Sequence, residues 1–386
     1  MTVTVAIDSF KGSLTSRMAG DAVRDGIFSV YPDAVVHVRS LADGGEGTVD
    51  AIAAARGGRI CKVKVTGPLG EPVDAEYGII DKERTAIMEM SSSSGITLVP
   101  PNKRNPYYTT TYGFGELIRH AIVESGCRRL ILGIGGSATN DGGVGMLTAL
   151  GFGMLDADGE DIPLGAIGLS RLVRISAESV LPELSECEFI IACDVKNPLL
   201  GKSGASFVFG PQKGAAPEQV EAMDGWLKNY ADLTYKTLGK DCRDTDGAGA
   251  AGGLGFALFT YLGGRSESGI SLVIRETGLE AFVRESDIVV TGEGRLDGQS
   301  VMGKAPVGVA ALAKKYGKPV VAFSGCATDD ARLCNSHGID AFFPIPRGPM
   351  TLAEAMDVDN AYSNLRATAE QAFRLFKVAS EQGSDK

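Results

Sequence analysis

Apolar runs alternate with segments of helical periodicity at the beginning of the chain. The apolar run over residues 3–7 predicts a strand that is covered on both faces. Apolar positions at near-helical spacing follow it and predict a helix that Pro32 ends. A second apolar run covers residues 35–41, and an alanine-rich helix is expected over residues 45–56. This order of strand, helix, strand and helix predicts a parallel α/β sheet.

The pattern changes after residue 60. Residues 62–65 and 73–79 alternate between polar and apolar side chains, and residues 67–72 between them are rich in glycine and proline. Such a pattern is typical of two antiparallel strands joined by a turn. Strand and helix alternate again further along the chain, and a regular doubly wound pattern returns after about residue 265. We therefore predict a domain boundary near residue 60.

Carboxylates directly follow several of the predicted strands. They are Asp8, Asp43, Asp194 and Glu293. In open parallel sheets, ligands bind beyond the carboxyl ends of the strands. Acids gathered there, together with lysines and glycine-rich turns, indicate a divalent metal ion and a phosphorylated ligand. The pattern predicts a phosphotransferase.

Composition narrows the class of protein further. The 386 residues, 44% hydrophobic and 22% charged, are typical of a soluble globular protein of two domains. The net charge of −10 argues against a nucleic-acid partner. No apolar run approaches the roughly 20 residues that span a membrane, and the N-terminus lacks the basic region of a signal peptide. Seven cysteines without a Cys-x-x-Cys pair favour a reducing compartment, so a cytoplasmic location is expected.

Two glycine-rich segments are candidates for phosphate binding. Residues 133–143 leave a strand, offer successive backbone N–H groups and lead into a helix, which favours phosphate contact over a plain turn. Residues 298–304 match the first positions of a P-loop, but Ala305 replaces the hydroxyl residue that would hold magnesium. The missing hydroxyl argues against a strict P-loop, while Lys304 at a helix N-terminus remains suited to an anion.

A third glycine-rich segment raises the alternative of a dinucleotide-binding enzyme. Residues 247–252 match the dinucleotide fingerprint, yet they follow a polar stretch rather than a strand. Close helix packing explains these glycines better than a nicotinamide site. The alternatives to a phosphotransferase are an NAD-dependent oxidoreductase acting on a small hydroxy acid and a ligand sensor without catalytic activity.

Taken together, these segments resemble the type-1 glycerate kinase family. The first segment, residues 8–14, reads Asp-Ser-Phe-Lys-Gly-Ser-Leu. The others are residues 42–48, 66–70, 133–143, 193–195, 197–199, 209–214, 247–253 and 291–299. They span nearly the whole chain in the order of the family. One departure is Ile7, which stands where the family usually has proline.

The resemblance implies an activity and a fold. The activity is transfer of the γ-phosphoryl group of ATP to D-glycerate, commonly at the 2-hydroxyl, with Mg²⁺ as cofactor. The fold is α/β with two domains and the active site in the cleft between them. One is a Rossmann-like, flavodoxin-like parallel-sheet domain from residues 1–60 and 265–386, and the other is a mixed α/β domain inserted over residues 61–264. A homodimer is also expected.

Phosphoryl transfer mainly requires positioned reactants and neutralised charge, which gives the matched residues hypothetical roles. Asp194 is the candidate base for the attacking hydroxyl, and Lys11 and Asp43 are the other candidate catalytic residues. Candidate substrate-binding residues are Asp8, Ser9, Glu293, Arg295 and Asp297. Candidate nucleotide-binding residues are Gly135, Gly136, Ser137, Asn140, Lys213, Gly249 and Lys304. Candidate Mg²⁺ ligands are Asp8, Asp43 and Glu293.

Overall fold

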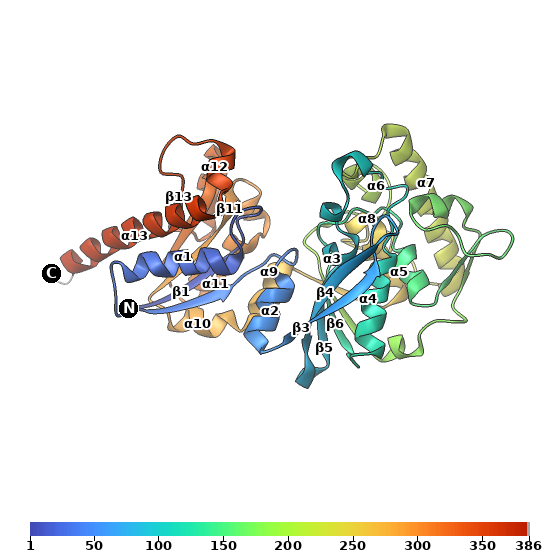
Figure 1. Ribbon diagram of the computed structural model, residues 1–386, viewed down its shortest axis with the longest axis horizontal. Helices are drawn as coiled ribbons and strands as arrows, with labels where there is room; N and C mark the ends of the chain where they lie inside the picture. Colours follow the sequence, from blue (N-terminus) through green and yellow to red (C-terminus); the bar gives the residue numbers. More distant parts are fainter. Residues whose placement is uncertain (384–386) are drawn as a thin grey trace. The chain divides into compact units, whose positions relative to one another are not determined.

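The computed structural model describes residues 1–383, which form two compact units (Figure 1). Unit 1 comprises residues 1–43, residues 50–56 and the chain from Ile270 onward. Unit 2 comprises residues 44–49 and residues 57–269. Within residues 1–383, no helix combines the length and the apolar character needed to cross a membrane.

A five-stranded sheet forms the centre of unit 1, and all of its neighbouring strands are parallel. Its strands are β1 (Thr2–Ile7), β2 (Val35–Ser40), β11 (Ile288–Leu296), β12 (Val320–Ala327) and β13 (Ala341–Pro344). The spatial order is β13-β12-β11-β1-β2, so the direction of winding reverses between β1 and β11. This is the flavodoxin-like order, in which ligands bind at the reversal point. The predicted parallel α/β fold is confirmed.

Helices cover both faces of β1. Val3, Val5 and Ile7 belong to a buried cluster with α1 and α13, while Thr4 on the opposite face bonds to Ser286 at the end of α10 with an Oγ1–Oγ distance of 2.6 Å. Such double coverage explains why this strand is an apolar run rather than an alternating one. The helices of unit 1 are α1 (Ser16–Phe28), α2 (Thr48–Arg56, of which residues 50–56 belong to this unit), α9 (Gly269–Thr277, of which residues 270–277 belong to this unit), α10 (Leu279–Glu285), α11 (Ala305–Lys315), α12 (Leu352–Met356) and α13 (Val358–Gly383). Its short 3₁₀ helices are η7 (Ser300–Met302) and η8 (Asp329–His337).

The helix expected over residues 45–56 begins later than predicted. The first residue of α2 is Thr48, and the residues before it form a turn. Gly44 and Gly47 in that turn adopt positive φ angles of 88° and 91°, which glycine tolerates and a continuing α-helix does not. The glycines therefore form a loop after Asp43 instead of the first turn of a helix.

A mixed six-stranded sheet forms the centre of unit 2, in the order β10-β9-β6-β5-β4-β3. Its strands are β3 (Arg59–Thr66), β4 (Pro72–Ile80), β5 (Thr85–Glu89), β6 (Arg129–Gly133), β9 (Glu188–Ala192) and β10 (Arg265–Glu267). The pairs β3–β4 and β4–β5 are antiparallel, as predicted for residues 61–90, and the remaining pairs are parallel. A separate antiparallel pair joins β7 (Gly153–Leu155) and β8 (Arg174–Ser176).

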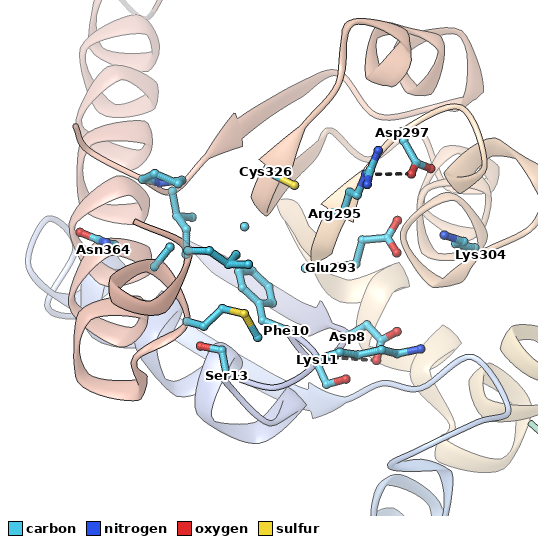
Figure 2. Close-up of a pocket in the computed structure, with 18 of the residues that line it drawn as sticks. Asp8, Phe10, Lys11, Ser13, Glu293, Arg295, Asp297, Lys304, Cys326 and Asn364 are labelled. Atoms are coloured by element: carbon cyan, nitrogen blue, oxygen red, sulfur yellow. Dashed lines mark hydrogen bonds and ion pairs between the residues drawn. The ribbon is translucent and has the colours of Figure 1, made fainter. Parts of the chain in front are cut away.

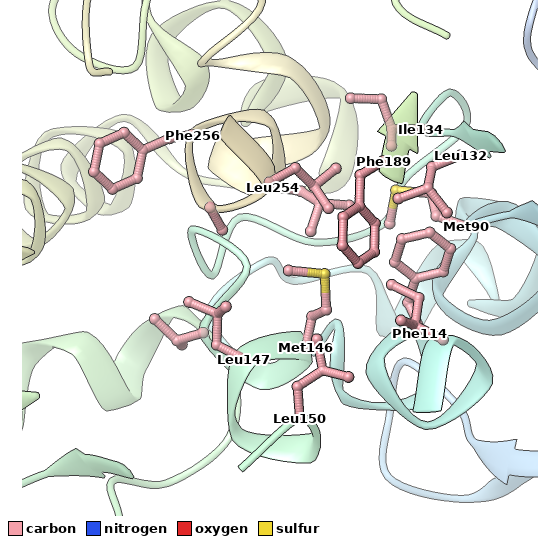
Figure 3. Close-up of a cluster of buried hydrophobic side chains, with 14 of the residues drawn as sticks. Met90, Phe114, Leu132, Ile134, Met146, Leu147, Leu150, Phe189, Leu254 and Phe256 are labelled. Carbon is pink, nitrogen blue, oxygen red and sulfur yellow. The ribbon is translucent and has the colours of Figure 1, made fainter. Parts of the chain in front are cut away.

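Apolar side chains from the sheet and the helices of unit 2 form one buried cluster. Phe114 on α4, Leu132 on β6, Met146 on α5, Phe189 on β9 and Leu254 on α8 all belong to it (Figure 3). The α-helices of the unit are α3 (Ser91–Ser94), α4 (Tyr112–Val123), α5 (Val144–Ala149), α6 (Ala205–Phe209), α7 (Pro217–Leu238) and α8 (Ala250–Tyr261). Short 3₁₀ helices are η1 (Asp81–Glu83), η2 (Ile96–Leu98), η3 (Pro101–Lys103), η4 (Ala166–Arg171), η5 (Pro182–Glu186) and η6 (Pro211–Lys213).

Candidate active site

A cavity of about 380 Å³ lies in unit 1 where β1 and β11 end, at the reversal point of the sheet. One side of it carries charged groups, and Figure 2 shows the carboxylates and the basic side chains of this polar end gathered together. The residues of the polar end are Asp8, Lys11, Asp43, Glu293, Arg295, Asp297 and Lys304. Acids that are far apart in the sequence thus line a single cavity.

Asp8 is the most buried carboxylate of this cavity, with 5% of its surface exposed. Its backbone N–H donates to the Gly292 carbonyl at 2.9 Å, which fixes the end of β1 beside β11. Burial, and then the negative charge of Asp43, raise the pKa of Asp8 to about 7. A hydrogen bond from the Ser9 N–H to Asp8 Oδ1, at 2.7 Å, acts in the opposite direction but does not offset these effects.

Glu293 lies on β11 and accepts a hydrogen bond from Ser300 Oγ at 2.5 Å. Burial raises the pKa of the Glu293 carboxyl, and the charges of Asp297 and Asp43 add to the effect. The Ser300 hydrogen bond and the positive charge of Lys304 lower it. Neighbouring carboxylates therefore disfavour the ionised forms of Asp8 and Glu293, and a cation placed beside these two groups would relieve that repulsion.

The basic residues of the polar end belong to three segments. Lys11 is exposed in the loop between β1 and α1, and its charge favours the ionised form of Asp8. Arg295 on β11 is also exposed and forms an ion pair with Asp297, with an Nε–Oδ2 distance of 3.2 Å. Lys304 is the N-cap residue of α11, whose first turn contains Pro306. Lys304 thus lies at a helix N-terminus, as expected from the sequence, and that position suits an anionic ligand.

Residues to which the sequence assigned no role of their own line the rest of the cavity. Most are apolar: they include Phe10, Ile345, Pro346, Met350, Leu352, Ala355 and Met356. Two polar groups lie among them, Ser13 and Asn364. The hydroxyl oxygens of Ser9 and Ser13 are buried and have no hydrogen-bond partner in the described part of the chain. Met350, Leu352 and Met356 lie on or next to the short helix α12 and are exposed. Their sequence does not distinguish apolar residues that line a cavity from apolar residues of a buried core.

Asp194 lies in unit 2, just beyond the carboxyl end of β9, and its side chain is exposed. Its Oδ1 accepts a hydrogen bond from the Gly269 N–H at 3.2 Å. The neighbouring strand β6 leads into Gly135 and Gly136, which are also exposed. The carboxyl end of the unit 2 sheet thus presents the Asp194 carboxylate and a glycine turn.

The remaining residues of the glycine-rich loop are buried. Lys213 is 2% exposed, and its Nζ donates to Ser137 Oγ at 2.7 Å and to the Thr139 carbonyl at 2.6 Å. Burial lowers the pKa of Lys213 to about 7. Asn140 donates from Nδ2 to Ser206 Oγ at 2.9 Å. Ser137, Asn140 and Lys213 therefore hold the loop in place, and only Gly135 and Gly136 are exposed to a ligand.

Gly249 and its neighbours are explained by close packing. A Cβ atom at Gly249 would lie 2.2 Å from the Pro198 carbonyl oxygen, and one at Gly252 would lie 2.1 Å from the Thr139 carbonyl oxygen. No side chain fits at either position. The segment resembling a dinucleotide fingerprint thus brings the start of α8 against two loops of unit 2.

Comparisons with known proteins agree over the whole chain. The model of the glycerate kinase family matches residues 3–377. Glycerate kinase of Bacillus subtilis (strain 168) is 46% identical over 379 residues, covering 98% of each chain, and glycerate 2-kinase of Escherichia coli (strain K12) is 46% identical over 365 residues, covering 95% of each. A crystal structure described as a glycerate kinase 2 from Salmonella typhimurium LT2 superposes with a TM-score of 0.88 at 46% identity, covering 99% of each chain. The chain belongs to the glycerate kinase family and is a kinase, not an oxidoreductase.

Proposed function

We propose that this enzyme transfers the γ-phosphoryl group of ATP to the 2-hydroxyl of D-glycerate and produces 2-phosphoglycerate. The observation that carries the proposal is the grouping of Asp8, Asp43 and Glu293 with Lys11, Arg295 and Lys304 around one cavity at the reversal point of a parallel sheet. Phosphoryl transfer needs such a set of cation-binding and anion-binding groups. The relative named glycerate 2-kinase supports the choice of the 2-hydroxyl.

The carboxylates suit Mg²⁺ that arrives with its own water and phosphate ligands. Within residues 1–383, no three His, Cys, Asp or Glu side chains are close enough together to enclose a metal ion. Mg²⁺ usually takes only one or two carboxylates and completes its shell with water and substrate phosphates. Asp8, Asp43 and Glu293 would hold it directly or through water, and the bound ion would neutralise phosphate charge.

The basic residues and their neighbours are assigned to the anionic groups of the reactants. Lys11 and Arg295 would contact the glycerate carboxylate or the transferring phosphoryl group. Asp297 holds the Arg295 guanidinium through their ion pair and so limits its orientations. Ser9 follows Asp8 in the chain and also lines the cavity, and its buried hydroxyl, which has no partner among the described residues, would supply a further hydrogen-bonding group.

Asp194 is the proposed base for the hydroxyl of glycerate. Its exposure leaves its carboxylate accessible, and the hydrogen bond from the Gly269 N–H holds the carboxylate at the end of β9. A carboxylate in this role accepts the hydroxyl proton as the oxygen attacks phosphorus, which typically contributes about 10²–10⁴-fold to the rate. The exposed backbone of Gly135 and Gly136 would contact phosphate oxygens.

The test is an assay of the purified chain with ATP, Mg²⁺ and D-glycerate, followed by identification of the phosphoglycerate isomer by ³¹P NMR. We expect stoichiometric ADP and 2-phosphoglycerate, with much slower turnover of L-glycerate. Formation of 3-phosphoglycerate alone would contradict the proposed position of transfer. Absence of ADP formation under all these conditions would contradict the proposed reaction.

A further inference from the structure

The cavity of unit 1 has a second end that glycerate does not need. Phe10, Ile345, Met350, Leu352 and Met356 are among its lining residues. Figure 2 shows Asn364 on the opposite side of the cavity from the charged groups Glu293, Arg295 and Lys304. Leu352 is 76% exposed and Met350 and Met356 are 36% and 38% exposed. Large apolar side chains left exposed around a cavity are typical of a binding site for an apolar group.

The chemistry of glycerate excludes it from the apolar end. Each of its carbon atoms carries an oxygen, so it has no apolar face to place against methionine, leucine or phenylalanine side chains. The cavity, at about 380 Å³, also falls in the range of roughly 300–1,000 Å³ that is usual for larger organic ligands. The apolar end therefore has a different occupant.

The phosphoryl donor, ATP, has an apolar end and a charged end, as the cavity does. A purine ring is flat and apolar on both faces, and ribose links it to a chain of charged phosphates. In this cavity, apolar side chains lie at one end, while Lys11, Arg295 and Lys304 lie at the other, with Lys304 at the N-terminus of α11. Apolar residues that hold a ring and cationic groups that hold phosphates are what such a molecule requires.

Buried polar atoms on the apolar side provide hydrogen bonds for the ring or the ribose. Ser13 Oγ is buried and has no partner among the described residues. Asn364 is 7% exposed; its Oδ1 accepts from Arg347 Nε at 3.0 Å, whereas its Nδ2 lies 4.0 Å from Met350 Sδ. Pockets that bind purines combine apolar walls with a small number of such groups to fix orientation.

We propose that the apolar end of this cavity, formed by Phe10 and the segment from Ile345 to Met356, binds the adenine base of ATP. The triphosphate then extends toward Lys304 and Lys11 at the polar end. This inference rests on the proposed function for the identity of the donor. It places the base of the nucleotide in unit 1, whereas the sequence assigned nucleotide binding mainly to the loop that contains Ser137 and Asn140. In that loop Ser137 Oγ accepts from Lys213 Nζ and Asn140 Nδ2 donates to Ser206 Oγ.

The test compares two substitutions on the same short helix. Ala355 on α12 lines the cavity, so Ala355→Phe places a ring in the proposed base site. Ala353 on the same helix is exposed and does not line the cavity, so Ala353→Phe is the matched control. We expect Ala355→Phe to raise the KM for ATP at least tenfold and to leave the KM for D-glycerate within twofold, while Ala353→Phe changes neither.

A second variant and a direct binding measurement guard against misfolding of the first variant. Leu352→Ser alters a side chain that is already largely exposed, so the fold tolerates it, and the loss of its apolar contact should weaken ATP binding severalfold. Adenosine, which lacks phosphates, should bind the wild type by isothermal titration calorimetry and compete with ATP. Its binding should be lost in Ala355→Phe and retained in Ala353→Phe.

The possible outcomes separate this inference from the proposed function. If Ala355→Phe raises the KM for D-glycerate and leaves adenosine binding intact, the apolar end does not hold the base and the inference is overturned. Unchanged adenosine binding in both Ala355→Phe and Leu352→Ser overturns it as well. If adenosine binds as expected but no phosphoglycerate forms from D-glycerate, the base site stands and the proposed reaction fails.

Discussion

The backbone N–H of Asp8 donates to the carbonyl oxygen of Gly292 at 2.9 Å, which brings the end of β1 against the residue that precedes Glu293. On its other side, Gly292 lies so close to β12 that an added Cβ atom would be 2.1 Å from the Phe323 carbonyl oxygen. Backbone packing of three adjacent strands thus sets the positions of two carboxylates of the cavity.

Substitution of Gly292 tests this arrangement. Gly292→Ala should lower the free energy of unfolding by about 1–3 kcal/mol, because β11 or β12 must move to accept the methyl group. The same movement should displace Glu293 and reduce kcat. Chemical denaturation and steady-state kinetics measure the two effects. Gly348→Ala is the matched control, because an added Cβ atom there meets no neighbouring atom. If Gly292→Ala and Gly348→Ala had the same free energy of unfolding and the same kcat, the close packing at Gly292 would be contradicted.

The raised pKa of Asp8 predicts a pH-dependent stability. Between the pKa of 3.8 in an unfolded chain and about 7 in the fold, the native state binds more protons, so stability falls as pH rises. Asp8→Asn removes that dependence. In EDTA, the variant should be more stable than the wild type at pH 8, by up to roughly 4 kcal/mol, and this margin should disappear below pH 4.

Thermal unfolding across this pH range measures the effect, with the exposed Asp33→Asn as the control. A margin that is the same at pH 4 and pH 8 would show that Asp8 titrates normally. The stabilising change should also abolish most turnover, because the amide lacks the negative charge proposed for cation binding.

Replacement of Asp194 tests the proposed base. Asp194→Asn should reduce kcat by about 10²–10⁴-fold and leave the KM values for ATP and D-glycerate within a fewfold, because the amide keeps the shape but cannot accept the proton. Steady-state kinetics in both substrates measures this. Asp244→Asn, at another exposed acid of unit 2, is the control. A kcat close to that of the wild type would remove Asp194 from the mechanism.

The buried Lys213 of unit 2 predicts that stability rises with pH, the opposite of the effect of Asp8. The pKa of Lys213 falls from 10.5 in an unfolded chain to about 7 in the fold, so the unfolded state binds more protons between these values and stability rises with pH. Lys213→Met removes both the titration and the two hydrogen bonds to Ser137 and Thr139. The wild type should exceed the variant in stability by a margin that grows from pH 7 to pH 10.

Hydrogen exchange of the backbone amides in residues 137–140 provides the second measurement for Lys213. Faster exchange in Lys213→Met is expected because the loop loses its buried donor. A margin of stability that does not change with pH would indicate that Lys213 keeps its proton throughout this range.

The residues of the polar end could be predicted from the sequence, because ligand-binding residues of parallel sheets follow the carboxyl ends of the strands. Asp8 and Glu293 directly follow or terminate apolar runs, and parallel strands end at the same edge of a sheet. The spacing of apolar residues could therefore place these acids near each other without a structure. The same rule applies to Asp194, but at the end of a strand in the other sheet.

The apolar end of the cavity and the burial of Lys213 could not be predicted from the sequence. Met350 and Leu352 lie after the last strand, on a loop and a five-residue helix whose apolar pattern is too short to show which side faces a cavity. Lys213 looks like a solvated lysine in a turn, and only tertiary packing reveals that it is buried. Gly249 likewise matched a nucleotide-binding pattern for reasons of packing.

The pairing of β1 with β11 has a consequence for biosynthesis. The Thr2 N–H donates to Asp287 Oδ2 at 2.7 Å across 285 positions of the chain. A nascent polypeptide leaves the ribosome from its N-terminus, so β1, α1 and β2 emerge long before the strands that complete their sheet. All of unit 2 is synthesised in the interval between β2 and β11. The apolar strands at the N-terminus therefore remain without their partner strands until β11 has been synthesised, so we expect unit 1 to be the part of the chain more prone to aggregation during translation.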